Sequence, residues 1–518
     1  METGVYNRVK WTLDDDVLLL EPSEKYNASE QLLSDFSRAA VKSIKTKGII
    51  TFEEKELIGM FRQFKNLRTA DLSGFDTKEA VSFEKLFSDC VNLREVNLSS
   101  FDTRSAINFS GMFAGCERLK SIDVSHFDTS NATNFEEMFC YCKRLESLDL
   151  SHFDTSRARD MGYMFNNCAA LKNLDVSNFD TSNVTDMIGM FFWCRGLTSL
   201  DLSNFDTSET TFMSNLFSGC SSLTSLDLSN FDTSKVTYMD YMFCECFKLT
   251  DIDVSHFNTD KVIDMSGMFD NCFGLTNLDV SNFNTSKVDN MYCMFSGCRL
   301  LTSLDLSNFD TSNVTNFRAM FSECYSLKEL NISNFQFKKS VDVYAMFSLT
   351  DLQVLNMENI KSDVDFCLTE LSVKNHCHLI VPKEIEELAK QITNPSILVY
   401  VSSATLYHFN KAFIEKVITA LDTTTRLDFK NDLAVIKKNP KKDLTLALYK
   451  ATELARINGH TNSTDLTAIS TITEHYGITI GKLRILDQKQ VIDLFNKTGL
   501  ASDIDAYLNG VPLEDILA

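Results

Sequence analysis

The chain has 518 residues with a formal net charge of −21, and 44% of the residues are hydrophobic. Its 40 Phe residues can build a large core, which excludes a disordered or collagen-like chain. The excess of Asp and Glu argues against nucleic acid or an anionic membrane surface as the partner, because both require clustered Lys and Arg. No apolar run approaches the roughly 18 residues that span a bilayer, so we expect no transmembrane segment.

The first residues do not have the pattern of an export signal. Residues 1–26 lack a basic start followed by an apolar stretch, and a short apolar run follows three Asp residues instead. The 15 Cys residues favour a reducing compartment, because an odd number of thiols is hazardous in an oxidising one. From these features we expect a cytoplasmic protein.

A repeat of 26 residues dominates the sequence. Phe recurs at one position of twelve consecutive units, from Phe61 to Phe347, without any insertion or deletion. A fixed period of this length is typical of a solenoid, in which each unit is stabilised mainly by its neighbours. We predict a solenoid of about twelve stacked coils over residues 55–360.

Each repeat contains a predicted short helix and a predicted strand. In one unit, the residues with the spacing of a helix face are Met187, Met190, Phe191 and Cys194. The strand that follows has the LxxLxL spacing of a leucine-rich repeat, at Leu197, Leu200 and Leu202. We therefore predict an α/β leucine-rich-repeat solenoid, with a parallel sheet on one face and short helices on the other.

Equivalent side chains of successive coils are predicted to form columns. Two Phe columns, from Phe61 to Phe347 and from Phe75 to Phe335, are expected to dominate stability, because each buried ring contributes roughly 1.5–3 kcal/mol. Ten Cys residues form another column, which could hold a metal ladder, disulfides or buried free thiols. We favour buried thiols, because disulfides require a closer approach than the coil spacing provides. The column comprises Cys90, Cys116, Cys142, Cys168, Cys194, Cys220, Cys246, Cys272, Cys298 and Cys324.

Three other Cys residues lie off this column. Cys140, Cys244 and Cys293 do not share its position in the repeat. We expect these three thiols to be the better candidates for exposure to solvent.

A column of acidic residues is the candidate partner-binding site. Each lies between the inward-pointing Leu residues of a predicted strand and therefore faces outward. Adjacent carboxylates should repel by roughly 1 kcal/mol, so Ser hydroxyl groups, counter-ions or partial protonation must relieve the charge. The column is either an acidic face for a basic partner or cations, or a solvated surface that prevents aggregation. The candidate residues are Asp123, Asp149, Asp175, Asp201, Asp227, Asp253, Asp279 and Asp305.

A second Asp column follows the second Phe column in the motif FDT. We interpret these residues as turn-capping residues, because Asn258 and Asn284 replace Asp at two of the positions and can make the same hydrogen bonds.

The unit LxxLDLSNFDTSNVTDMxxMFxxC resembles the BspA-type leucine-rich repeat surface proteins of bacteria. The resemblance covers about residues 55–360. It implies an N-terminal cap at residues 1–54 and a strand–helix–strand cap at residues 361–403. It also implies a non-enzymatic binding protein, often an adhesin, and a location at the cell surface if the chain is exported by another route.

The repeat ends before residues 404–518, where helical periodicity predicts a small all-α domain. Catalytic motifs are weak here: Gly477–Leu483 lacks the Ser or Thr of a phosphate loop, and His376, Cys377 and His378 are better explained as an end cap than as a zinc site. We therefore expect no enzymatic activity, no cofactor and no metal. The leading hypothesis is a recognition protein for a protein or glycan, and the alternatives are a cytosolic or virion-associated scaffold and an unrecognised activity in residues 404–518.

Overall fold

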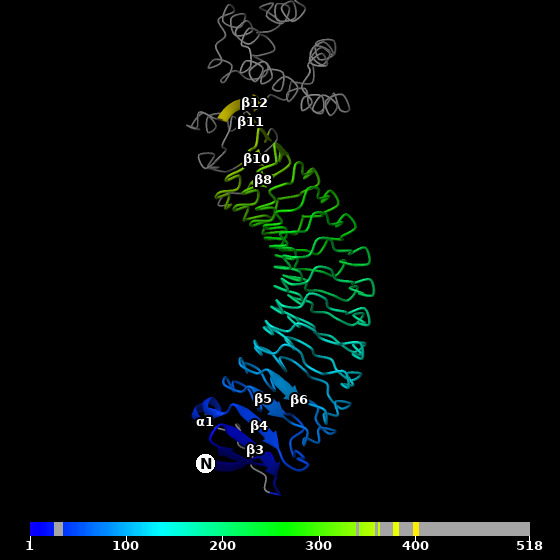
Figure 1. Cartoon of the computed structure of the whole chain (residues 1–518). Coiled ribbons are helices and arrows are strands. Elements are labelled where there is room, and N and C mark those ends of the chain that lie inside the picture. The colour runs from blue at the N-terminus through cyan, green and yellow to red at the C-terminus, as the bar shows by residue number, and fades with distance from the viewer. Residues whose placement is uncertain (25–34, 338–340, 358–360, 363–376, 383–396, 403–518) are drawn as a thin grey trace, which may run out of the picture. The chain divides into compact units, whose positions relative to one another are not determined.

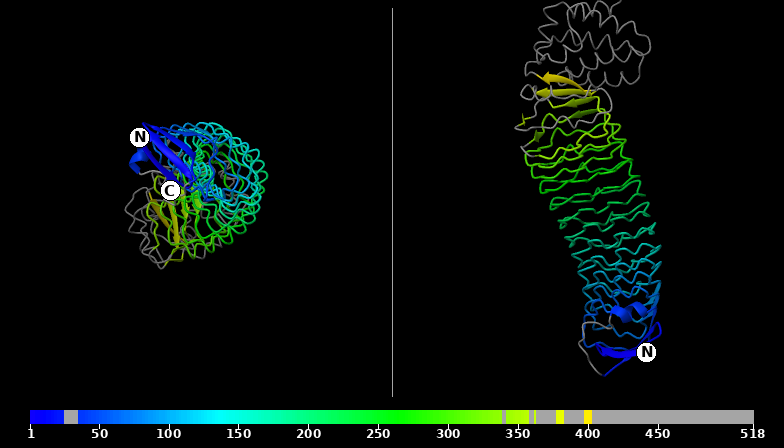
Figure 2. Two further views of the ribbon diagram at one scale, coloured as in Figure 1. Left: turned by 90° about the horizontal axis from the view of Figure 1, so that it is seen from below. Right: turned by 90° about the vertical axis from the view of Figure 1, so that its left-hand side faces the viewer.

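The structure is a computed structural model, and its described residues form two compact units. The first unit runs to residue 328 and resumes at residues 336–351, and the second contains residues 329–335 and the described residues from 352 onward. In the first unit, successive coils of the chain stack side by side (Figures 1 and 2). The described residues are 1–24, 35–337, 341–357, 361–362, 377–382 and 397–402.

The first unit begins with a sheet that leads into the coils. Its six strands are β1 (Glu2–Tyr6), β2 (Val9–Asp14), β3 (Val17–Pro22), β4 (Ser43–Thr46), β5 (Thr69–Asp71) and β6 (Glu95–Asn97), in that order. Strands β1 to β3 are antiparallel, whereas β3 to β6 pair in parallel. The helix α1 (Asp35–Ala40) precedes β4 in the chain, and the short strand β8 (Gln336–Phe337) comes near the end of the unit.

The second unit contains a parallel sheet with the strand order β12-β11-β9-β7. The predicted strands of the C-terminal cap are confirmed, because β11 and β12 pair in parallel. The predicted helix between them and the predicted all-α domain at residues 404–518 lie outside the described residues. The strands of this unit are β7 (Glu329–Asn331), β9 (Val354–Asn356), β10 (Lys361–Ser362), β11 (Cys377–Pro382) and β12 (Ile397–Ser402).

Main-chain hydrogen bonds join neighbouring coils along the segment that contains the Met-Phe pair, here called the Met-Phe segment (residues 187–194 and their equivalents). Alternate residues donate to the following coil: the N–H groups of Met187, Gly189, Phe191 and Trp193 bond to the carbonyl groups of Phe212, Ser214, Leu216 and Ser218, over 2.7–3.1 Å. The intervening residues bond within their own coil, as Met190 does to Met187. An isolated parallel bridge precedes each segment, such as Asp186 with Phe212.

The predicted short helices on this face are wrong, and the backbone shows why. Gly189 and Trp193 have φ values of 55° and 57°, and an equivalent left-handed pair recurs in every coil from Gly59 to Leu349. A right-handed helix requires negative φ at each residue, so a left-handed residue at every fourth position prevents it. Among the described residues, α1 is the only α-helix.

The predicted continuous sheet at the LxxLxL positions is also wrong for the central coils. Within the described residues, strands form at these positions only as β5 and β6 near the start of the coils and as β7 and β9 in the second unit. Across residues 121–310 of the described chain, the inward Leu, Ile and Val residues alternate with exposed residues as predicted, but no strand is assigned. The ladder that holds these coils together therefore lies in the Met-Phe segments.

The predicted alignment of side chains in columns is confirmed. The rings of Phe139, Phe165 and Phe191 stack with centroids 5.9–6.0 Å apart, and the stack continues without a break from Phe61 to Phe347. All twelve rings are buried, so each adds stacking to the free energy of burial. Successive 26-residue units therefore coil in the same register.

A buried Thr column ties the FDT turns together. The Thr181 hydroxyl donates to the main-chain carbonyl of Asp206 and accepts from the Asp206 N–H, each over 2.8 Å. Thr181 is fully buried, so its hydroxyl supplies hydrogen-bond partners to two main-chain groups of the next coil.

Candidate functional site

The aspartate row consists of the eight exposed carboxylates Asp123, Asp149, Asp175, Asp201, Asp227, Asp253, Asp279 and Asp305. Each lies at the same position of its coil, on the side of the inward Leu residues, here called the strand side. Neighbouring carboxylates repel each other electrostatically: the charges of Asp175 and Asp227 both act to raise the pKa of Asp201. The row is therefore a line of one negative charge per coil.

Each carboxylate of the aspartate row is held in one orientation by the Ser residue two positions later. One oxygen accepts the Ser main-chain N–H over 2.9–3.1 Å throughout the row. In four coils the hydroxyl also donates to that oxygen, as Ser177 does to Asp175 over 2.6 Å. These bonds leave the second oxygen of the carboxylate available for a partner.

The Ser hydrogen bonds also stabilise the negative charge of the carboxylates in the row. Hydrogen bonds from the Ser177 hydroxyl and main chain lower the pKa of Asp175, and the same cause lowers the pKa of six other members of the row. Hydrogen bonding to the charged form favours that form. Ser hydrogen bonding is therefore one of the ways of relieving repulsion that the sequence suggested, and it favours the ionised form of these seven carboxylates.

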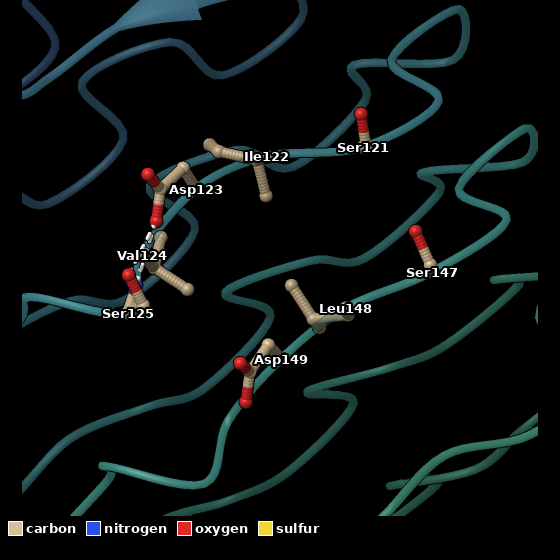
Figure 3. A pocket seen from close by; sticks show the side chains of 8 residues that line it. All are labelled: Ser121, Ile122, Asp123, Val124, Ser125, Ser147, Leu148 and Asp149. Atoms are coloured by element: carbon tan, nitrogen blue, oxygen red, sulfur yellow. Dashed lines mark hydrogen bonds between the residues drawn. The ribbon is translucent and has the colours of Figure 1, made fainter.

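A shallow groove of about 420 Å³ lies on the strand side between two coils. Figure 3 shows Ser121 and Asp123 on one coil and their equivalents Ser147 and Asp149 on the next. In the described coils, residues 121–125 make no main-chain hydrogen bond to residues 147–151. The apolar side chains of the two coils line the space between them. The groove thus combines carboxylates, hydroxyls and an apolar floor.

The second Asp column is confirmed as a set of turn residues. The carboxylate of Asp206 accepts the main-chain N–H of Ser208 over 2.9 Å. Asn258 and Asn284 make the same bond through their side-chain oxygens, to Asp260 and Ser286. An amide can therefore replace the carboxylate here without loss of the turn.

The prediction for the Cys column is confirmed, whereas the prediction for the three other thiols is wrong. Each column thiol is a buried free thiol that donates to a Phe carbonyl group in the preceding coil, as Cys194 does to Phe165 over 3.0 Å. Burial raises the pKa of Cys194 to about 12. Cys140, Cys244 and Cys293 are also buried, at 4–8% exposure, because the Met-Phe segments of adjacent coils pack beside them.

The Met-Phe segments and the residues directly before them carry a second group of ionisable residues, which the sequence analysis did not identify. Burial raises the pKa of Glu136, Asp160, Asp186 and Asp240, and it raises the pKa of Asp270 to about 6. The residue type at these repeat positions varies strongly from coil to coil, and this variation was the sequence feature that could have identified the group. Among the described residues, no group of three or more His, Cys, Asp or Glu side chains is placed to hold a metal ion.

No helix in the described part of the chain is long and apolar enough to cross a membrane.

The strand side carries carboxylates that are fixed by hydrogen bonds. This arrangement suits recognition of cationic groups by charge and hydrogen bonding.

Three overlapping segments match the family model described as "Mycoplasma protein of unknown function, DUF285". The matched residues are 55–174, 170–272 and 245–360, which together cover more than half of the chain and all of the repeats. No curated protein matches the chain.

Proposed function

The chain belongs to the family described as Mycoplasma protein of unknown function, DUF285, and we propose that its coils form a non-enzymatic recognition surface for a basic protein partner. The likeness of the repeat to BspA-type leucine-rich repeat surface proteins supports a binding or adhesion role. The observation that carries the proposal is the aspartate row, because eight exposed carboxylates are fixed by hydrogen bonds at one position of successive coils.

Pre-orientation is the physical basis of the proposal. A flexible surface carboxylate loses side-chain entropy when it pairs with a cation, and this loss offsets most of the benefit of an exposed ion pair. In the aspartate row, Ser hydrogen bonds already fix each carboxylate. Several oriented carboxylates in a line can therefore engage several cations of one partner, and the contributions add across coils.

The test compares two quadruple variants that remove the same charge from different columns. The row variant carries Asp175→Asn, Asp201→Asn, Asp227→Asn and Asp253→Asn. The control variant carries Asp154→Asn, Asp180→Asn, Asp206→Asn and Asp232→Asn in the FDT turns. Both variants keep their turns, because Asn97 and Asn258 occupy equivalent positions and make the same hydrogen bonds.

The probe is a fluorescent peptide of ten Lys residues, and its dissociation constant is measured by anisotropy at several salt concentrations. We expect the row variant to bind at least about tenfold more weakly than the control variant, since it loses four oriented carboxylates. Equal weakening in the two variants would show that net charge alone attracts the peptide and would refute a role for the row. Binding of the peptide that does not respond to salt would also contradict the proposal, because salt screens pairing between exposed Lys and Asp side chains.

A further inference from the structure

One position of the repeat forms a stacked column of planar side chains over four coils. Phe247 stacks on Phe273 with centroids 4.9 Å apart, and the guanidinium of Arg299 lies 3.9 Å above the other face of Phe273. The same guanidinium lies 5.6 Å from the ring centre of Tyr325, in the following coil. These four residues are spaced by 26, so they occupy equivalent positions of successive coils.

Arg299 is held by a pair of residues in the coil that follows it. Its guanidinium donates to Glu323 over 2.8 Å and faces the ring of Tyr325, two residues later. The Tyr325 hydroxyl donates to the same carboxylate oxygen of Glu323 over 3.2 Å. A carboxylate and an aromatic ring separated by one residue therefore form a receptor for a guanidinium group.

The carboxylate and the following ring of this receptor recur three coils earlier without the internal Arg, and Arg195 occupies the position of Phe273 there. Glu245 and Phe247 occupy the positions of Glu323 and Tyr325, and the position of Arg299 is occupied by Ser221. The backbone conformation is also the same at the two sites, since φ is 57° at Glu245 and 59° at Glu323.

The main chain around the missing Arg is equally similar. Ser221 donates its N–H to the Gly219 carbonyl group over 2.8 Å, as Arg299 does to that of Gly297. Ser221 ends in a hydroxyl and cannot reach as far as an Arg side chain. Phe247 is 37% exposed, and the one aromatic or cationic contact recorded for its ring among the described residues is Phe273.

We propose that Glu245 and Phe247 bind an arginine side chain of a partner protein, which takes the place that Arg299 occupies three coils later. The guanidinium stacks on the free face of Phe247 and pairs with Glu245. Glu245 and Asp270, which interact electrostatically, supply negative charge beside this occupant, and Lys248 follows Phe247 in the chain. The nearest cation at the equivalent position, Arg195, is already held over Trp193 at 4.2 Å.

The protein supplies its own precedent for this choice of occupant. Aromatic rings of the Met-Phe segments repeatedly lie against a cation from the same chain, as in Tyr141 with Lys143 and Tyr344 with Arg318. The closest approaches, at 3.9–4.5 Å, are those of guanidinium groups to Phe273, Trp193 and Tyr344. Arg299 lies 5.6 Å from the ring centre of Tyr325, as the Lys143 ammonium does from that of Tyr141. A planar guanidinium stacks on a ring while it pairs with a carboxylate, which an ammonium does less well.

The experiment uses the full chain and two fluorescent peptides of alternating Gly with either five Arg or five Lys residues. The wild-type protein is expected to bind the Arg peptide about fivefold more tightly than the Lys peptide. Phe247→Ala removes the stacking surface and Ser221→Arg fills the site from within, so both variants should lose this preference. Ala169→Arg is the control for added charge, because the coil that follows it has Trp193 and Arg195 instead of a Glu and an aromatic ring. This control should keep the preference.

Two results would overturn the proposal. The first is equal binding of the two peptides by the wild-type protein, and the second is an Arg preference that survives both Phe247→Ala and Ser221→Arg. Failure of the aspartate row is distinguishable from either result. The quadruple row variant changes the affinity for both peptides together and leaves their ratio unchanged, whereas Phe247→Ala changes the ratio.

Discussion

The ring of Trp193 lies directly over the α-carbon of Gly219, which occupies the same repeat position as Trp193 in the following coil. A methyl group added to Gly219 would collide with the indole ring. The same arrangement places Tyr163 over Gly189 and Tyr241 over Gly267. Side chains at the left-handed positions thus lean toward the following coil, and a large aromatic ring is accommodated where that coil carries Gly.

We predict that Gly219→Ala lowers the free energy of unfolding by about 2–4 kcal/mol, since it combines a collision with a left-handed φ of 74°. Adding Trp193→Ala to the Gly219→Ala variant should remove the loss of stability caused by the collision, but not the loss caused by the left-handed backbone. Chemical denaturation of the two single variants and the double variant gives the coupling between them. Gly162→Ala, where the nearest atoms are 3.3 Å or more from the added carbon, is the matched control and should cost much less. Additive single effects would contradict the contact.

A second prediction distinguishes the observed Met-Phe segment from the helix that the sequence suggested. Ala319 has a φ of 54°, so Ala319→Gly should leave the free energy of unfolding unchanged or raise it by up to about 1 kcal/mol. In a helix the same substitution would lower it by about 1 kcal/mol. Ala114→Gly is the control, because Ala114 is buried and is not among the left-handed residues, and it should destabilise the protein.

These two predictions show where the sequence was informative and where it was not. The 26-residue period predicted the stacked coils, because identical spacing forces residues such as Phe165 and Phe191 into contact. It could not distinguish a helix from a segment with left-handed residues, because the apolar spacing of Met187, Met190, Phe191 and Cys194 satisfies both. The Gly residues at positions 111, 189 and 267 were the available signal, but residues such as Tyr163 and Trp193 adopt the same conformation and conceal it.

The candidate site was predictable only in part. Alternation with buried Leu and Val residues predicted the exposure of the aspartate row, and the structure agrees. The arginine receptor could not be predicted, since it depends on Glu245 and Phe247 facing a residue 24 to 26 positions earlier. That relationship becomes visible once the contacts of Arg299 with Glu323 and Tyr325 are known.

The pH dependence of stability should reveal Asp270. Burial raises its pKa in the folded chain to about 6, above the ordinary Asp value of 3.8, so the folded state binds more protons than the unfolded state between these values. The contribution of this group to the free energy of unfolding therefore falls as the pH rises from about 4 to about 6. In Asp270→Asn this loss is absent, so the stability of the variant relative to the wild type should increase over that range. Asn166 occupies the equivalent position, which makes the substitution structurally acceptable.

Denaturant midpoints at pH 4, 5, 6 and 7 provide the measurement, and the comparison with the wild type cancels the contributions of the other carboxylates. A constant difference between the two proteins would contradict the raised pKa. Asp175→Asn is a useful contrast: hydrogen bonds from Ser177 lower the pKa of Asp175, so this variant should lose stability relative to the wild type as the pH rises through the range in which the unfolded carboxyl ionises.

Thiol labelling tests the burial of the cysteines. In a variant with Cys367→Ser and Cys377→Ser, the remaining 13 thiols are all buried in the native structure. We expect an aromatic disulfide reagent to label them only as fast as the coils open, because burial raises their pKa values and excludes the reagent. Rapid labelling of Cys140, Cys244 or Cys293 in the native protein would restore the original prediction that these three are exposed.

The most direct test of recognition by the aspartate row is the location of a bound basic peptide. A peptide of ten Lys residues with a photo-crosslinking group at its centre is bound to the full chain, irradiated and mapped by mass spectrometry. We predict crosslinks on the strand side, within residues 173–177, 199–203, 225–229 or 251–255. Crosslinks concentrated in the FDT turns or spread over the whole surface would contradict the claim that this row recognises the partner.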